Sequence, residues 1–189
     1  MIISLSGAPG SGKSTIAQML AAKLGWPRYY IGGLRREAAR KRGLSLAEYN
    51  KLGESDISTD KEVDEYQHEL GEKEDNFVIE GRTSWYFIPH SWKIYLDVSK
   101  EEGAKRILGS LQHKNDRNED SNIKTLADVL ASTSERIASD TRRYRQYYNI
   151  DVYDKNNYDF YLDTSNLTPD QAFAAVLKSV QERLDNKKN

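Results

Sequence analysis

The most informative absence in this 189-residue sequence is cysteine, which does not occur at all. Without thiols the protein forms no disulfide, no thiolate zinc site and no iron–sulfur cluster, and it has no cysteine nucleophile. This absence is typical of a protein from a reducing compartment.

An excess of charge of one sign and long apolar runs are also missing. The 28 Lys and Arg residues stand against 29 Asp and Glu, a formal net charge of −1. Binders of nucleic acid or of acidic membranes rely on clustered positive charge, so both classes are disfavoured. No apolar run approaches the roughly 18 residues that cross a bilayer. Ile2–Leu5 leads directly into a glycine-rich loop, which leaves no room for a secretion signal. We expect a cytoplasmic monomer that binds neither membrane nor nucleic-acid polymer.

The pattern of apolar residues predicts one domain of alternating strands and helices. Short buried strands are expected over 1–6, 77–79, 94–96 and 158–162, and helices over 13–24, 33–42, 45–52, 59–71, 100–111, 124–148 and 169–184. Strands interleaved with helices predict an α/β fold, a parallel sheet sandwiched by helices. Three helices between the first two strands are more than a crossover needs, and form a candidate substrate-binding lobe or lid. We expect the wholly polar stretch 112–122 to be a loop.

The residues that carry the chemistry begin directly after the first strand. They fit the pattern G-x-x-x-x-G-K-[ST], with one more hydroxyl residue behind it: Gly7, Ala8, Pro9, Gly10, Ser11, Gly12, Lys13, Ser14 and Thr15. In such a P-loop, glycines let backbone N–H groups curl around phosphate oxygens, and a helix N-terminus favours the anion. The lysine supplies a charge to the β- and γ-phosphates, and the serine hydroxyl can bind Mg²⁺. The motif therefore predicts a site for ATP and Mg²⁺.

The P-loop alone does not say what is done with the nucleotide. G-x-G-x-x-G is absent, which disfavours dinucleotide binding, and no Asn-Lys-x-Asp is present to recognise guanine. At the end of the second predicted strand stand Glu80, Gly81 and Arg82. Ligands bind at the carboxyl edge of a parallel sheet. There the glutamate could hold a Mg²⁺-bound water, the glycine permits close approach, and the arginine can clamp a second phosphate.

Two further groups of charges are candidates for substrate contact. Arg36 belongs to a basic cluster at the start of the inserted helices. We expect most residues of this cluster to form a solvated face. Arg136, Asp140 and Arg143 lie on one face of the predicted helix 124–148, with Arg142 adjacent. On spacing alone an ordinary salt-bridged helix is the better explanation. A phosphoryl-transfer enzyme, however, needs cations over the transferred group.

Together these motifs resemble the cytidylate kinase family, especially its short archaeal-type members. The resemblance covers residues 1 to about 181 and rests on the P-loop, on Arg36 with the following stretch 42–50, on Glu80-Gly81-Arg82, on the stretch 136–151, and on Asp163-Thr164-Ser165. Where the short family members usually carry Ser-x-Gly-Asp before the first arginine helix, this chain reads Tyr30-Ile31-Gly32-Gly33.

The resemblance implies a single P-loop kinase domain that transfers a phosphoryl group from ATP to CMP or dCMP with Mg²⁺. The core would comprise residues 1–29, 76–111 and 149–189, the monophosphate-binding lobe about 30–75, and the lid about 112–143. Arg36 and Arg82 would hold the acceptor phosphate. The lid would contribute Arg136, Arg143, Asp140 and Arg142, the first two as catalytic cations. Two alternatives remain open: a P-loop kinase of another small acceptor, such as another nucleotide, a sugar acid or a shikimate-like molecule, and a regulatory ATP-binding protein.

Overall fold

The computed structural model describes residues 1–113 and 122–186. Its elements follow one another in the order β1 (Ile2–Gly7), α1 (Lys13–Leu24), β2 (Arg28–Tyr30), α2 (Ile31–Lys41), α3 (Leu46–Gly53), α4 (Ser58–Lys73), β3 (Phe77–Glu80), α5 (Ser84–Phe87), β4 (Trp92–Asp97), α6 (Lys100–Leu111), α7 (Leu126–Tyr148), a 3₁₀ turn (Lys155–Asn157), β5 (Phe160–Asp163) and α8 (Pro169–Asn186). The expected loop over 112–122 falls mostly on 114–121, which lie outside the described residues.

The strands form one parallel sheet in the order β2-β3-β1-β4-β5, which confirms the predicted α/β architecture. The first strand is central, with Leu5 opposite Glu80 on one side and Ile94 on the other. Its carboxyl end therefore lies beside the carboxyl end of β3. This register brings the P-loop next to the Glu80-Gly81-Arg82 segment.

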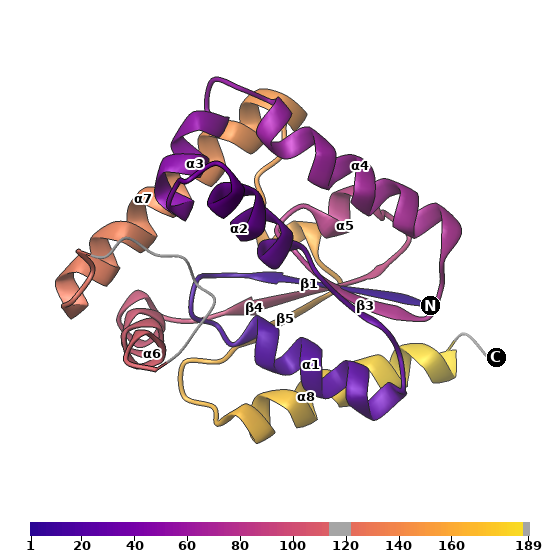
Figure 1. Ribbon diagram of the computed structural model, residues 1–189. Coiled ribbons are helices and arrows are strands. Elements are labelled where there is room, and N and C mark those ends of the chain that lie inside the picture. The colour runs from indigo at the N-terminus through magenta and orange to yellow at the C-terminus, as the bar shows by residue number, and fades with distance from the viewer. Residues whose placement is uncertain (114–121, 187–189) are drawn as a thin grey trace.

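The two faces of the sheet are covered by different helices (Figure 1). Ile3, Leu5 and Val78 pack with α1 and α8, whereas Ile2, Phe77 and Ile79 pack with α2, α4 and Ile88. Residues of one strand alternate between the faces because successive side chains point in opposite directions. Burial on both faces explains why these strands read as continuous apolar runs.

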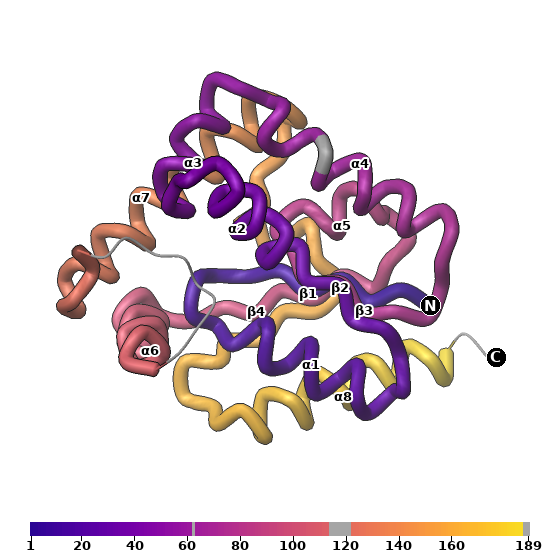
Figure 2. Tube along the Cα trace, viewed as in Figure 1, coloured from indigo at the N-terminus to yellow at the C-terminus, as the bar shows by residue number. Residues whose placement is uncertain are grey.

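Helix ends follow the capping residues in the sequence. Gly25 ends α1 with a left-handed φ of 68°, and the Ser99 hydroxyl accepts a hydrogen bond from Glu102 N–H at the start of α6. The Thr125 hydroxyl accepts from Asp128 N–H and begins α7. This 23-residue helix contacts α6 near its start and α3 further along, so it passes from the P-loop side to the inserted helices (Figure 2).

Three short elements were not predicted: β2, α5 and the 3₁₀ turn. β2 has only three residues, all half-buried, and it pairs with β3 from Arg28 opposite Val78 to Tyr30 opposite Glu80. A polar segment of this length shows no hydrophobic alternation, so only the partner strand defines it. The last strand also begins at Phe160 rather than at Tyr158. Within residues 1–113 and 122–186, no helix is both long and apolar enough to cross a membrane.

Candidate active site

The P-loop turns tightly between β1 and α1. Gly10 has a φ of +80°, and a Cβ there would lie 2.3 Å from the carbonyl oxygen of Gly103, so only glycine fits. Gly12, with a φ of +86°, caps the N-terminus of α1. The loop residues that line the cavity beside it are Pro9, Gly10, Ser11, Gly12, Lys13, Ser14 and Thr15. Gly7 and Ala8 begin the loop, and Ala8 N–H donates to Leu96 O of β4 at 3.0 Å.

Lys13 is anchored on the loop itself. Its Nζ donates to the carbonyl oxygens of Gly7 and Ala8 at 2.9 and 2.7 Å, and to Ser11 Oγ at 3.4 Å. These contacts hold the ammonium group at the start of a helix whose N-terminal dipole also favours anions. The charge of Lys13 and the dipole of α1 therefore favour an anion at the same place in the cavity.

A buried carboxylate lies beside the P-loop serine. Ser14 Oγ donates to Glu80 Oε2 at 2.6 Å, and Arg28 Nε donates to Glu80 Oε1 at 2.8 Å. Glu80 is only 3% exposed, so the arginine compensates a charge that burial would otherwise disfavour. A hydroxyl and a carboxylate at this distance are hard oxygen donors, the ligand chemistry that Mg²⁺ prefers.

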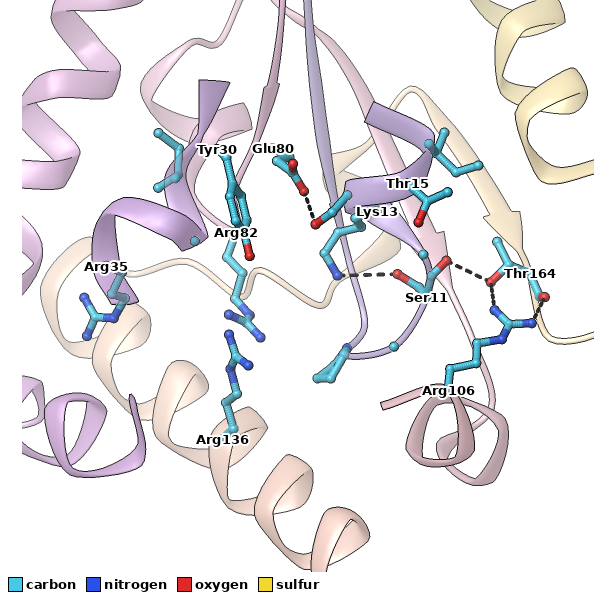
Figure 3. A pocket seen from close by; sticks show the side chains of 18 of the residues that line it. Ser11, Lys13, Thr15, Tyr30, Arg35, Glu80, Arg82, Arg106, Arg136 and Thr164 are labelled. Carbon is cyan, nitrogen blue, oxygen red and sulfur yellow. Dashed lines mark hydrogen bonds between the residues drawn. The ribbon is translucent and has the colours of Figure 1, made fainter. Parts of the chain in front are cut away.

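The P-loop borders a cavity of about 750 Å³. Cations reach it from several elements: Lys13 from α1, Arg35 and Arg36 from α2, Arg82 after β3, Arg106 from α6 and Arg136 from α7. In Figure 3 the tips of Arg82 and Arg136 point toward one another from opposite sides. Such a concentration of guanidinium groups can bind several phosphate groups at once.

Arg36 is held by its own helix and by the preceding strand. Its Nη1 donates to Tyr30 Oη at 2.6 Å and to the Gly32 carbonyl at 2.9 Å. The residue is only 6% exposed. The guanidinium therefore lines the cavity in one fixed orientation rather than extending into solvent as a member of the basic surface cluster.

Arg82 is held by α7 and by the turn that follows it. Its Nε lies 2.7 Å from Asp140 Oδ2 and 3.1 Å from Tyr153 Oη, and Tyr153 Oη donates to the same carboxylate at 2.9 Å. Burial alone would lower the pKa of Arg82, but Asp140 together with Tyr153 and Tyr144 more than offsets it, and the pKa lies above its usual value. Gly81 also lines the cavity, with Ser84 Oγ 2.4 Å from where a Cβ would be. A side chain at position 81 would disturb the turn that aims Arg82.

The charged residues of α7 separate into three environments. Arg136 lines the cavity. Arg143 does not: it is fully buried and pairs with Asp60 Oδ2 at 3.2 Å and with Asp140 Oδ1 at 2.8 Å. Asp140, 1% exposed, lies between Arg143 and Arg82 and is not among the lining residues. Both residues were expected to contact the substrate, but they form a buried ion network behind the cavity wall, because the side chain of Arg143 reaches Asp60 of α4.

Arg142 also lies away from the cavity. Its Nη2 contacts Glu54 at 2.8 Å and Glu135 at 2.7 Å, on a side chain that is 47% exposed. Arg142 lowers the pKa of Glu54 to about 2 through this hydrogen bond. The contact joins α3 to α7 at the surface, so Arg142 does not line the cavity where a substrate contact was expected of it.

Several lining residues were not singled out from the sequence. Arg106 donates to the Thr164 carbonyl at 2.8 Å, and Thr164 Oγ1 donates to the Ser11 carbonyl at 3.1 Å, which ties α6 and the turn after β5 to the P-loop (Figure 3). Arg106 lies in an ordinary amphipathic helix, and no local pattern separates it from a surface arginine.

Two aspartates of α4 also border the cavity. Arg35 Nη1 contacts Asp60 Oδ1 at 2.5 Å, and Tyr148 Oη donates to Asp64 Oδ2 at 2.5 Å. Burial raises the pKa of Asp64 to about 7. In the sequence both belong to an acidic stretch with the composition of a solvated face, and only their partners from α2, α7 and the residue before α5 show that they are buried.

A parallel sheet, a P-loop and a cavity ringed by arginines together define a P-loop kinase. A family model described as an AAA domain matches residues 3–127. Among curated proteins, a cytidylate kinase of Natronomonas pharaonis is 38% identical over 95% of this chain and 89% of its own length, and one of Pyrococcus furiosus is 34% identical over 98% and 90%. The chain belongs to the cytidylate kinase family. Membership of this kinase family implies the use of ATP.

Solved structures support the same fold. A shikimate kinase of Aquifex aeolicus is 21% identical, with a TM-score of 0.57 over 97% of this chain and 98% of its own. An uncharacterized protein of Eubacterium ventriosum is 17% identical, with a TM-score of 0.67 over 96% and 98%. At these identities the likeness extends to the fold and not to the acceptor.

Proposed function

We propose that this protein transfers the γ-phosphoryl group of ATP to CMP or dCMP, giving ADP and the corresponding diphosphate. One observation carries the proposal beside family membership. A single cavity is bordered by the P-loop and by Arg36, Arg82 and Arg136, which come from three other parts of the chain. A kinase needs such convergence, because donor and acceptor phosphates must lie in line in one water-excluding site.

The donor side is assigned to the loop over residues 7–15. Backbone N–H groups and the N-terminus of α1 bind the phosphates, and Lys13 neutralises charge as the bond to the leaving oxygen breaks. Ser14 and Glu80 are the residues that would hold Mg²⁺, directly or through water, since their side chains meet at 2.6 Å beside the loop. When bound, the ion would supply neutralisation of charge on the phosphate oxygens.

The acceptor side is assigned to Arg36, Gly81 and Arg82, with Arg136 acting on the transferred group. No general base is required, because the acceptor is a phosphate oxygen that is already ionised at pH 7. Asp140 would act through Arg82, which it holds at 2.7 Å, rather than by contacting the substrate. Arg143 would act one step further away, by holding Asp140 and Asp60 together.

The proposed division of the chain follows these roles. The core comprises 1–29, 76–111 and 149–189, the monophosphate-binding lobe about 30–75, and the lid about 112–143. The lobe carries Arg36, and the lid carries Arg136. Movement of the lobe and lid toward the core would exclude water, which otherwise competes with the acceptor for the phosphoryl group.

The direct test is ADP release from Mg·ATP with CMP, dCMP, UMP, AMP, GMP and shikimate offered separately, beside a control without acceptor. Strong stimulation by CMP or dCMP supports the proposal. Stimulation by another acceptor retains the mechanism and moves the specificity. ATP binding without stimulation by any acceptor would favour a regulatory ATP-binding protein and contradict the proposed reaction.

A further inference from the structure

Tyr30 occupies a position in the cavity wall that connects the two sides of the proposed site. It is the last residue of β2 and the cap of α2, and its ring borders the cavity between α2 and Glu80 (Figure 3). The Arg28 guanidinium, which pairs with Glu80, lies 5.3 Å from the centre of the ring on the donor side. On the acceptor side Arg36 lies 5.8 Å from the same centre. The ring is therefore in contact with one cation from each side.

The hydroxyl of Tyr30 fixes one end of the Arg36 guanidinium. Nη1 carries two protons, and it donates to Tyr30 Oη at 2.6 Å and to the Gly32 carbonyl at 2.9 Å. Two acceptors on one nitrogen set the plane of the whole group, since a guanidinium is rigid. An arginine that is already oriented loses less conformational entropy when it binds a phosphate.

The ring can lie there only because the first turn of α2 has no side chain beneath it. A Cβ at Gly33 would stand 2.7 Å from Tyr30 Cδ1 and 3.1 Å from Cε1, and a Cβ at Gly32 would stand 3.0 Å from Cε2. The 2.7 Å contact requires the ring to move, because Cδ1 is not the far end of a flexible chain, and the two longer contacts are tighter than most that real Cβ atoms make. Neither glycine has a positive φ, so the requirement is for space and not for backbone conformation.

We propose that Tyr30 is a positioning residue for Arg36, and that Gly33 provides the space for its ring. The inference rests on the proposed function and deepens it: Tyr30 and Gly33 together orient the arginine that receives the phosphate of the acceptor monophosphate. The effect should appear in acceptor binding, with little change in the chemical step, because an interaction present equally in the ground and transition states affects KM more than kcat.

The first test is Tyr30→Phe, which removes the hydroxyl and keeps the ring. We expect the KM and the calorimetric Kd for CMP to rise about tenfold, the effect typical of losing a hydrogen bond to a charged group. The kcat and the KM for ATP should change less than about twofold. Tyr29→Phe is the matched control, because Tyr29 Oη donates to Glu74 at 2.6 Å on an exposed surface and does not line the cavity.

The second test is a double-mutant cycle with Gly33→Ala. In the wild-type background the added Cβ should displace the ring and raise the Kd for CMP. In a Tyr30→Ala background there is no ring to displace, so Gly33→Ala should leave the Kd unchanged. Alanine is the better helix former, so loss of helix stability does not explain an effect.

The possible results distinguish failure of the proposed kinase reaction from failure of the positioning role of Tyr30. Wild-type protein that releases no ADP with any monophosphate overturns the proposed function. Normal wild-type turnover with a Kd for CMP in Tyr30→Phe within twofold of that in Tyr29→Phe overturns the positioning role alone. Equal effects of Gly33→Ala in both backgrounds would refute the part assigned to Gly33.

Discussion

Replacing Arg143 with methionine tests the most consequential placement in the structure. Sequence periodicity puts Arg143 on the same face of α7 as Arg136, and a catalytic role was expected for both. The structure instead makes Arg143 a fully buried cation between Asp60 and Asp140. Methionine has a similar length and no charge, so Arg143→Met removes the ion pairs while filling most of the space.

The expected cost in stability follows from the neighbouring charges. Removing one partner of a buried pair typically costs about 3–5 kcal/mol, because a carboxylate is left without its cation. Here Asp60 keeps Arg35 at 2.5 Å and Asp140 keeps Arg82 at 2.7 Å. Among the described residues Arg143 Nε also has no hydrogen-bond partner, so the substitution removes one unsatisfied donor. We therefore expect a cost below this range, about 2–3 kcal/mol.

The measurements are thermal unfolding, urea unfolding and steady-state kinetics on the same protein. A loss of about 2–3 kcal/mol should lower Tm by about 4–12 °C for a domain of this size. At a temperature well below that Tm, kcat should fall less than about tenfold, with most of the change in the acceptor KM through Arg82. In the parallel variant Arg136→Ala, kcat should fall by about 10² or more, because removing charge stabilisation from the transferred group acts on the transition state.

The opposite pattern would refute this reasoning. If Arg143→Met unfolds at the wild-type urea concentration and loses about 10² or more in kcat, Arg143 contacts the reacting phosphates in the working enzyme. The network seen here would then be only one arrangement of α7, and Arg143 rather than Arg136 would be the catalytic cation of this helix.

Three further predictions address the rest of the site. Lys13→Ala should lower kcat by about 10²–10⁴ with an unchanged unfolding midpoint, and near-normal turnover in the folded variant would contradict the role of the P-loop. Arg82→Ala should raise the KM for the monophosphate by at least about tenfold, and a change confined to the KM for ATP would show that Arg82 serves the donor. Burial raises the pKa of Asp64 to about 7, so the folded state binds a proton more tightly than the unfolded state. Its contribution to stability is therefore present in acid and is lost as pH rises from about 4 to about 7. Across this pH range the free energy of unfolding of the wild type, measured with urea, should fall by about 2–4 kcal/mol relative to that of Asp64→Asn. Parallel pH profiles of the two proteins would contradict the assignment.

Local sequence was enough to recognise the P-loop, to which the donor side of the site is assigned. The P-loop requires consecutive residues with special backbone geometry, so its pattern is contiguous and readable. Apart from β2, α5 and the 3₁₀ turn, the order of strands and helices was predicted as well, because burial on two faces produces short apolar runs separated by caps. Glu80-Gly81-Arg82 was recognised because it ends a buried strand, and the carboxyl ends of parallel strands meet at one edge.

Which residues line the proposed acceptor side of the cavity depended on tertiary structure. Arg136 and Arg143 share a helix face, and no local pattern distinguishes them. The helix is 23 residues long, so different parts of one face have different neighbours. Arg136 lines the cavity, whereas Arg143 pairs with Asp60 of α4. Which arginine lines the cavity is therefore decided by where the helix lies against the rest of the chain.

The same reason applies to Tyr30 and to the acidic residues of α4. In the sequence Tyr30 ends a three-residue segment that is too short to show a strand pattern, and Gly33 reads only as the first residue of a predicted helix. Only the pairing of β2 with β3 carries the ring over the first turn of α2, where the missing side chain becomes a requirement. Aspartates that resemble a solvated face become buried in the assembled fold, where Asp60 pairs with Arg35 and Arg143 and Asp64 accepts a hydrogen bond from Tyr148, because burial is a property of the assembled layers and not of any one segment.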